Sequence, residues 1–252
     1  MNLSGKNIVI TGGAQGLGLA MAKRFASLGA NVALIDMLAE QLADAVASFT
    51  SENTVKGYQA DITNEQQVVD TFNQINSDFG GIDGLINNAG ILRDGLLLKA
   101  KEGVVTDKMS LAQFQSVIDV NLTGVFLCGR EAASHMVSAK RQGVIINMSS
   151  VARAGNMGQT NYAASKAGVV AMTVTWAREL GRHGIRVGAI APGVIRTAMT
   201  DAMKPEAKER LLKMKPVGRL GEADEIAHTA QYIFENDFFT GRVVEIDGGI
   251  SF

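Results

Sequence analysis

The chain has 252 residues, of which 46% are apolar and 19% are charged. These proportions are typical of a soluble globular enzyme and exclude a disordered chain. The chain carries 24 basic and 25 acidic residues, so no basic excess indicates binding to nucleic acid or to an anionic membrane.

Compartment is indicated by two further features. The single cysteine, Cys128, cannot form a disulfide within the chain and favours a reducing compartment. The N-terminal residues lack the apolar stretch of a signal peptide, and no apolar run approaches the roughly 18 residues of a membrane helix. We therefore expect a cytoplasmic protein that does not bind membranes.

Seven short apolar runs alternate with longer helical patterns along the chain. Several of the runs are continuous in Val, Ile and Leu, which is typical of strands buried on both faces. The alternation predicts an α/β fold, a single domain over residues 1–252 with a doubly wound parallel sheet, the Rossmann fold. The expected strands lie at 7–12, 31–36, 55–61, 84–90, 143–149, 185–193 and 242–248.

The helical patterns lie at 17–29, 39–49, 64–79, 111–137, 161–181 and 222–234. Gly29 is expected to follow the end of the first helix, and Thr63 with Gln66 forms a possible capping box. Two connections are long enough to carry function: an extended loop at about 91–110, and a segment at about 194–220 that is expected to cover the substrate.

A glycine-rich turn, TGGAQGLG, joins the first strand to the first helix. Gly12, Gly16 and Gly18 allow backbone N–H groups at a helix N-terminus to approach a phosphate, with Gln15 and Leu17 beside them. The same glycines could merely pack a helix closely on a strand. The position of the turn after the first strand favours a dinucleotide site.

Asp36 ends the second strand, where an acid can bind the ribose 2′-hydroxyl of NAD. A 2′-phosphate would be repelled there, and no Arg or Lys follows before Lys56. The alternative is an Asp that caps the next helix. We favour the ribose role, with Met37 beside it, and expect NAD(H) to be preferred over NADP(H).

Tyr162 and Lys166 are four residues apart and so share one face of a helix. A phenol has a pKa of about 10, and an adjacent ammonium group is expected to lower it toward neutral pH. Small residues between and after them leave room for a ligand on that face. The pair therefore indicates an acid–base group, although a plain amphipathic helix would also present such a pair.

The glycine turn, NNAG (87–90), DVNLTGVF (119–126), NMSSV (147–151), NYAASKAG (161–168) and APGVIRT (191–197) occur in the order found in classical short-chain dehydrogenases/reductases, which the whole chain resembles. The resemblance implies that Tyr162 exchanges a proton with the substrate oxygen while hydride moves to or from a nicotinamide. It implies that Lys166 lowers the pKa of the tyrosine and holds the nicotinamide ribose. It further implies that Asn121 anchors a water in a proton relay.

The resemblance also implies a serine that hydrogen-bonds the substrate oxygen, and two serines compete for this role. The family's usual spacing before the tyrosine selects Ser149, whereas counting from Gly143 along the strand selects Ser150. Only one of two successive side chains can face the site. A one-residue deletion in the following loop reconciles the counts, and we choose Ser150.

Further cofactor contacts are implied by the same resemblance. Asp61 and Ile62 would contact the adenine. The NNAG residues would line the adenosine ribose, and the APGVIRT residues would hold the carboxamide and the pyrophosphate. These two groups are Asn88, Ala89, Gly90, Pro192, Gly193, Ile195 and Thr197.

Within the family, GILRDGLLLK (90–99) resembles 3-oxoacyl-acyl-carrier-protein reductases and acetoacetyl-CoA reductases. Arg141 and Arg182 lie roughly where such enzymes bind an acidic carrier. Asp36 departs from the NADPH-dependent members, so an NAD-linked dehydrogenase of 3-hydroxyacyl-CoA, acetoin, diols or other secondary alcohols is the alternative. The lysines of the 91–110 loop could bind CoA phosphates, contact another subunit or be inert. Family members are usually homotetramers, which we expect here.

Other classes of protein are disfavoured. A hydrolase would need a G-x-S-x-G turn or a matched Ser–His–acid set, and a metal enzyme would need spaced His and Cys ligands; the sequence has neither, so no metal is expected. A scaffold that binds NAD without turnover would be expected to lack the Tyr162–Lys166 pair.

Overall fold

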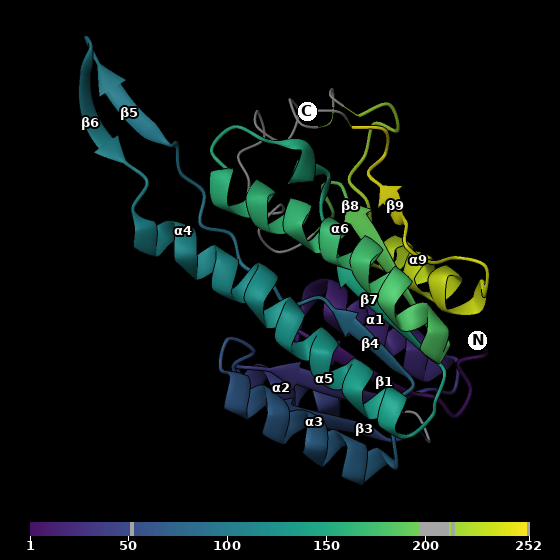
Figure 1. Ribbon diagram of the computed structural model, residues 1–252. Helices are drawn as coiled ribbons and strands as arrows, with labels where there is room; N and C mark the ends of the chain where they lie inside the picture. Colours follow the sequence, from purple (N-terminus) through teal and green to yellow (C-terminus); the bar gives the residue numbers. More distant parts are fainter. Residues whose placement is uncertain (51–52, 197–211, 213–214, 251–252) are drawn as a thin grey trace.

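The computed structural model describes residues 1–50, 53–196, 212 and 215–250 (Figure 1). A seven-stranded sheet with the order β3-β2-β1-β4-β7-β8-β9 forms the centre, and all neighbouring strands are parallel. The strands are β1 Asn7–Thr11, β2 Asn31–Asp36, β3 Val55–Gln59, β4 Gly84–Asn87, β7 Gly143–Met148, β8 Ile185–Pro192 and β9 Val243–Ile246. The predicted α/β fold and all seven strands are confirmed, and the strands end at most three residues earlier than expected.

Helices cover both faces of the sheet (Figure 1). On one face α1, α2 and α9 enclose an apolar core in which Phe25 and Phe234 meet edge to face at 5.2 Å. On the other face α3, α5 and α6 enclose a second core around Phe72, Leu127 and Met136. The helices are α1 Gly16–Ser27, α2 Ala39–Ala47, α3 Glu65–Phe79, α4 Leu111–Ile118, α5 Val125–Ser138, α6 Thr160–Leu180 and α9 Ala223–Glu235, with short 3-10 turns η2 Val151–Ala154 and η3 Gly181–His183.

Two expected helix ends can be compared with the structure. Gly29 has a φ of 87°, as expected of the residue after a helix. The capping box at Thr63 is wrong: Asn64 caps α3 by accepting a hydrogen bond from the Gln67 N–H. The Thr63 hydroxyl instead donates to Asp61 Oδ1 at 2.8 Å and is therefore not free to cap.

Helices α4 and α5 are joined by a π-helical segment, η1 Asp119–Gly124, into one long helix (Figure 1). By length and composition alone, this 28-residue helix, Leu111–Ser138, could cross a membrane. Such a test is weak, because core helices also pass it. The inner face of this helix packs on the sheet through buried residues such as Leu127 and Cys128.

The segment 91–110, expected to be a loop, contains an antiparallel hairpin of β5 Leu98–Lys101 and β6 Val104–Lys108. The hairpin stands beyond the end of α4, away from the sheet (Figure 1), and all residues of its two strands are exposed. Its base is held to the body of the protein, because Gly95 N donates to Gly158 O at 2.8 Å.

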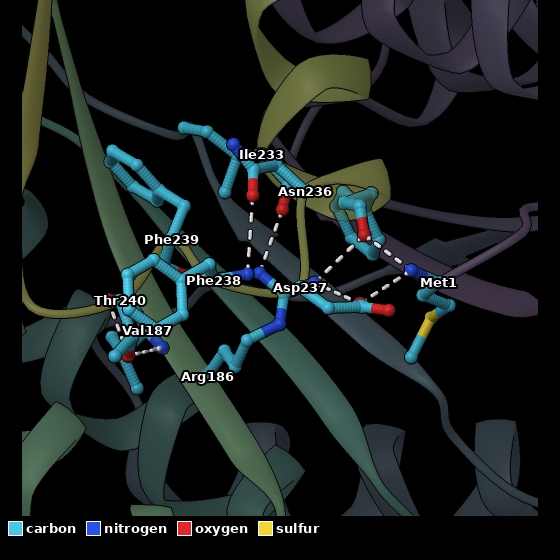
Figure 2. Close-up of polar contacts among 10 residues, drawn as sticks. Met1, Arg186, Val187, Ile233, Asn236, Asp237, Phe238, Phe239 and Thr240 are labelled. Carbon is cyan, nitrogen blue, oxygen red and sulfur yellow. Dashed lines mark hydrogen bonds and ion pairs between the residues drawn. The ribbon is translucent and has the colours of Figure 1, made fainter.

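The C-terminal end of α9 is fixed to β8 by Arg186 (Figure 2). A helix end leaves carbonyl groups without partners. The Arg186 guanidinium donates to the carbonyls of Ile233 and Phe234 at 2.8 and 2.7 Å. The amino group of Met1 donates to Phe234 O as well and pairs with Asp237 at 2.7 Å. These contacts hold α9 against the strand whose far end reaches the candidate site.

Candidate active site

Two adjoining cavities lie at the carboxyl ends of the central strands, where ligands bind in doubly wound sheets. The first, of about 440 Å³, is lined by the tyrosine, the lysine and both serines of the sequence motifs. The second, of about 350 Å³, is lined by the glycine turn and the end of β2. Leu17, Asn88, Gly90 and Ile91 line both cavities, so a single extended ligand can occupy the two.

Two glycines of the turn between β1 and α1, Gly12 and Gly18, have no room for a side chain. A Cβ on Gly12 would lie 2.8 Å from the Ala89 Cα, and one on Gly18 would lie 2.1 Å from the Gly12 carbonyl oxygen. Gly12 and Gly16 also have φ of 62° and 55°. Helix α1 starts here behind Gln15, which makes no side-chain cap, so its first N–H groups are available to a phosphate.

Asp36 lies at the second cavity, which Met37, Asp61 and Ile62 also line. The Asp36 carboxylate accepts hydrogen bonds from Ala14 N at 3.1 Å and from Leu38 N at 3.2 Å. A carboxylate has about four acceptor positions, so acceptor capacity remains for ribose hydroxyls. The residue therefore holds the turn before α2 and faces the cavity at the same time.

Tyr162 and Lys166 project from the first turns of α6 into the first cavity. Lys166 is 3% exposed, and its Nζ donates to Met148 O at 2.7 Å. Its Nζ lies 5.7 Å from the centre of the Tyr162 ring. Ala163, Ala164 and Ala167 surround the pair in the sequence, so little side-chain volume stands between it and a ligand.

The two serines have different partners. Ser150 hydrogen-bonds the Tyr162 hydroxyl, and its Oγ also accepts from Ala152 N at 3.1 Å. Ser149 donates its hydroxyl to Lys166 O at 3.0 Å and thereby fastens β7 to α6. The arrangement sets Ser150 beside the Tyr162 hydroxyl and gives Ser149 a partner in the backbone of the helix.

The expected net shift of the Tyr162 pKa toward neutral pH is wrong for the chain by itself, because this pKa is raised. Burial raises the pKa of Tyr162, the hydrogen bond from Ser150 opposes that shift, and the charge of Asp94 adds to it. Burial likewise lowers the pKa of Lys166 to about 8. The physical reason is that the ammonium lies over the ring and bonds to the Met148 carbonyl, whereas loss of hydration acts on both groups.

Asn121 lies in the π-helical segment and is fully buried. Its side chain makes two hydrogen bonds with the backbone of Ile91: Oδ1 accepts from the N–H at 2.8 Å, and Nδ2 donates to the carbonyl at 3.0 Å. A Cβ on Gly90 would lie 3.2 Å from Asn121 Oδ1 and 3.6 Å from Lys166 Nζ. Asn121 therefore fixes the wall of the cavity next to the lysine, a function that the sequence did not indicate.

A buried polar chain behind the site was also missed. Asn87 Nδ2 donates to Asn147 Oδ1 at 2.9 Å, and Asn147 Nδ2 donates to the Thr173 hydroxyl at 3.0 Å. These contacts join β4, β7 and α6 directly below the cavity. Asparagines at the ends of two otherwise apolar strands were the available signal.

Not all of the other residues expected to contact the cofactor lie in the part of the chain that the structure describes. Pro192, Gly193 and Ile195 line the first cavity, whereas Thr197 and most of the segment 194–220 lie outside the described residues. Within the described part of the chain, no group of His, Cys, Asp or Glu could hold a metal ion.

The two arginines expected to bind a carrier lie away from this site. Arg141 pairs with Asp83 and donates to Gly80 O at the amino ends of the strands, and Arg182 directly precedes β8. Both are therefore at the opposite edge of the sheet from the cavities. The cavity of the same subunit is one strand length, about 20 Å, away from these arginines, so a carrier bound to them would have to span that distance.

A glycine-rich turn that opens onto a buried tyrosine–lysine pair, at the carboxyl ends of a doubly wound sheet, is the arrangement of an oxidoreductase of the Rossmann fold. A family model described as enoyl-(acyl carrier protein) reductase matches residues 12–251. The chain belongs to the short-chain dehydrogenase/reductase family.

Individual relatives cover nearly the whole chain. It is 41% identical to the 3-oxoacyl-(acyl-carrier-protein) reductase FabG of Thermotoga maritima, over 99% of both chains. It is also 41% identical to the (2S)-((R)-hydroxy(phenyl)methyl)succinyl-CoA dehydrogenase subunit BbsD of Thauera aromatica, over 100% of this chain and 98% of that one. Among solved structures, levodione reductase matches with a TM-score of 0.87 and 36% identity, over 98% of this chain and 97% of the other.

Proposed function

We propose that this chain interconverts 3-oxoacyl and 3-hydroxyacyl thioesters, with NAD(H) as the preferred cofactor. The observation that carries the proposal is the Ser150–Tyr162 hydrogen bond in the lining of a cavity that adjoins the one at the glycine turn. Two of the most similar relatives support the substrate class, because the name of each refers to an acyl group on a carrier or on CoA.

The residues of the chain fit a nicotinamide dinucleotide. A Cβ on Gly16, at the start of α1, would meet no atom within 4 Å, so a pyrophosphate can approach the N–H groups of that helix end, and Asp36 can accept the ribose hydroxyls. The dinucleotide, when bound, supplies hydride to the carbonyl carbon or takes it from the alcohol carbon.

The protein supplies the proton and holds the oxygen. Burial keeps the Tyr162 hydroxyl protonated at neutral pH, so it can donate to the carbonyl oxygen as that oxygen gains negative charge. Ser150 holds the same oxygen with a second hydrogen bond. Lys166, 5.7 Å from the ring centre, stabilises the resulting phenolate through its charge.

The preference for NAD(H) depends on the second cavity. Asp36 places a carboxylate there, and no Lys or Arg is among the described residues that line it. A 2′-phosphate would therefore meet a like charge without a counter-ion.

The test uses acetoacetyl-CoA with NADH or NADPH, followed by cofactor absorbance. We expect faster turnover with NADH, and we expect Tyr162→Phe to lower kcat by about 10²-fold or more, whereas the exposed control Tyr232→Phe leaves it unchanged. Asp36→Ser should reduce the ratio of turnover with NADH to turnover with NADPH. A preference for NADPH in the unmodified enzyme would show that Asp36 does not select the cofactor.

A second candidate is the oxidation or reduction of small secondary alcohols and ketones. The similarity to levodione reductase favours it. Activity on acetoin or small diketones, without activity on acetoacetyl-CoA, would select this candidate and leave the assigned residues unchanged.

We also propose that the chain forms a homotetramer in which the outer faces of α5 and α6 meet a second copy. A cavity of about 360 Å³ lies between these helices, lined by Phe126, Trp176 and Leu180 among others, and Phe126 is 42% exposed. Light scattering during size exclusion should give four times the chain mass. A monomer would refute the assembly.

A further inference from the structure

A glutamine that lines the first cavity is bonded to an aspartate outside the lining. Gln159 lines this cavity three residues before Tyr162. Its Nε2 donates to Asp94 Oδ2 at 3.0 Å, and its Oε1 accepts from Asn156 Nδ2 at 2.9 Å. Both ends of the amide are thus occupied, which fixes the Asp94 carboxylate against a residue that lines the cavity.

The backbone around Asp94 is held by the start of the catalytic helix and by α4. Asn161 Nδ2 donates to Arg93 O at 2.9 Å, and Gln113 Nε2 donates to Arg93 O and to Asp94 O at 3.0 and 3.2 Å. This segment therefore keeps its position relative to Tyr162. The charge of Asp94 acts on the reaction centre, since it contributes to the raised pKa of the Tyr162 hydroxyl.

The first cavity offers little positive charge to a bound substrate. Of the described residues that line it, Lys166 is the one with a positive charge, and its Nζ is bonded to the Met148 carbonyl. Arg153, on the turn after Ser150, bonds to the Ser150 carbonyl and to Glu245. No cation of this set is therefore directed at a negatively charged substrate, while Asp94 opposes one.

This charge distribution matters for compounds with a carbonyl group at position 3. A free 3-oxo acid has a carboxylate separated by one carbon from the carbonyl that is reduced. The corresponding thioester or ester is neutral at that position. Binding the free acid would bring its carboxylate near the carboxylate of Asp94, one residue behind the cavity lining, and this disfavours the complex.

We propose that Asp94, oriented by Gln159, is a specificity-determining residue that disfavours free 3-oxo acids relative to thioesters and esters that are neutral at this position. This inference rests on the proposed function and adds to it the side chain that selects the substrate class.

The experiment compares kcat/KM for acetoacetate and for ethyl acetoacetate in the unmodified enzyme, in Asp94→Asn and in Asp70→Asn. The amide that Asp94→Asn introduces can still accept the Gln159 hydrogen bond, so the fold is kept. Asp70 is a matched control, because it accepts a hydrogen bond from Gln66 at 3.0 Å and is exposed on α3. We expect Asp94→Asn to narrow the ester-to-acid ratio by about fivefold, as for removal of one partly screened charge, and Asp70→Asn to leave it unchanged.

Two further measurements sharpen the test. Raising the salt concentration should reduce the ratio of kcat/KM for the ester to kcat/KM for the acid in the unmodified enzyme. The same increase in salt should change this ratio less in Asp94→Asn. The double change Asp94→Asn with Gln159→Lys adds a cation to the cavity lining and should increase kcat/KM for acetoacetate further.

Equal use of acid and ester by the unmodified enzyme, or a ratio that Asp94→Asn does not change, would overturn this inference alone and leave the proposed function standing. Turnover of neither substrate, nor of acetoacetyl-CoA, would overturn both.

Discussion

The buried ammonium group of Lys166 should reduce the stability of the protein at neutral pH, and Lys166→Met should reveal this. Burial lowers the pKa of Lys166 from 10.5 to about 8. Between these pH values the unfolded chain binds a proton that the folded chain has released, so stability rises with pH across this window. Below pH 8 both states are protonated and the full penalty of burying the charge remains.

The magnitude follows from the two pKa values. The difference between the two pKa values corresponds to about 3 kcal/mol of lost stability. Lys166→Met also removes the hydrogen bond to Met148 O, worth about 1 kcal/mol. The variant should therefore be more stable by about 2 kcal/mol at pH 7, and this advantage should be lost before pH 10.5, where the missing hydrogen bond leaves the unmodified protein more stable.

The measurement is urea unfolding followed by circular dichroism, at several pH values and at one protein concentration, because assembly also affects stability. Lys23→Met serves as the control, since Lys23 is exposed on α1. If the difference in unfolding free energy between Lys166→Met and the unmodified protein stays constant from pH 7 to pH 10, the reasoning about burial is refuted.

Three other changes have expected outcomes. Gly18→Ala should abolish dinucleotide binding in calorimetry and lower the free energy of unfolding by about 2 kcal/mol. The reason is that the new Cβ would lie 2.1 Å from Gly12 O. The control Gly181→Ala, at a position with open space around it, should change neither quantity. Ser150→Ala should lower kcat by about 10²-fold, while Ser149→Ala should mainly lower the melting temperature; the reverse pattern would move the catalytic role to Ser149. Asn121→Ala leaves the N–H and carbonyl of Ile91 without their partner, so thermal unfolding should show a loss of about 2 kcal/mol, and unchanged stability would contradict the role given to this amide.

The strands could be predicted because a short, continuous apolar run between turn residues is typical of a strand buried on both faces. The runs at 84–90 and 185–193 became β4 and β8, and the residues beyond the ends of these strands, 88–90 and 193, line the two cavities. The hairpin of β5 and β6 could not be predicted in this way, because both of its strands are exposed and carry no burial pattern.

At the site, the motifs identified which residues meet but not how they are bonded. Tyr162, Lys166 and Ser150 do line one cavity. Spacing alone could not show that the Lys166 ammonium bonds to the carbonyl of Met148, a residue on a strand, or that burial dominates the pKa of Tyr162. Such facts depend on depth and on partners distant in the chain, which a local pattern does not contain.

The π-helical segment has a geometric consequence for the long helix that contains Asn121. One continuous buried stripe runs along that helix through Val117, Asn121, Val125, Cys128, Ala132 and Met136. From Val117 to Met136 the stripe advances 19 residues in five turns, whereas five turns of an ordinary α-helix take 18. The wide turn at Asp119–Gly124 absorbs the extra residue, so the two halves keep the same angular phase toward the sheet. A one-residue deletion within this turn would preserve that phase in a regular helix but would remove the offset that brings Asn121 to Ile91. The helix thus carries one residue more than its packing requires, and that residue serves the site.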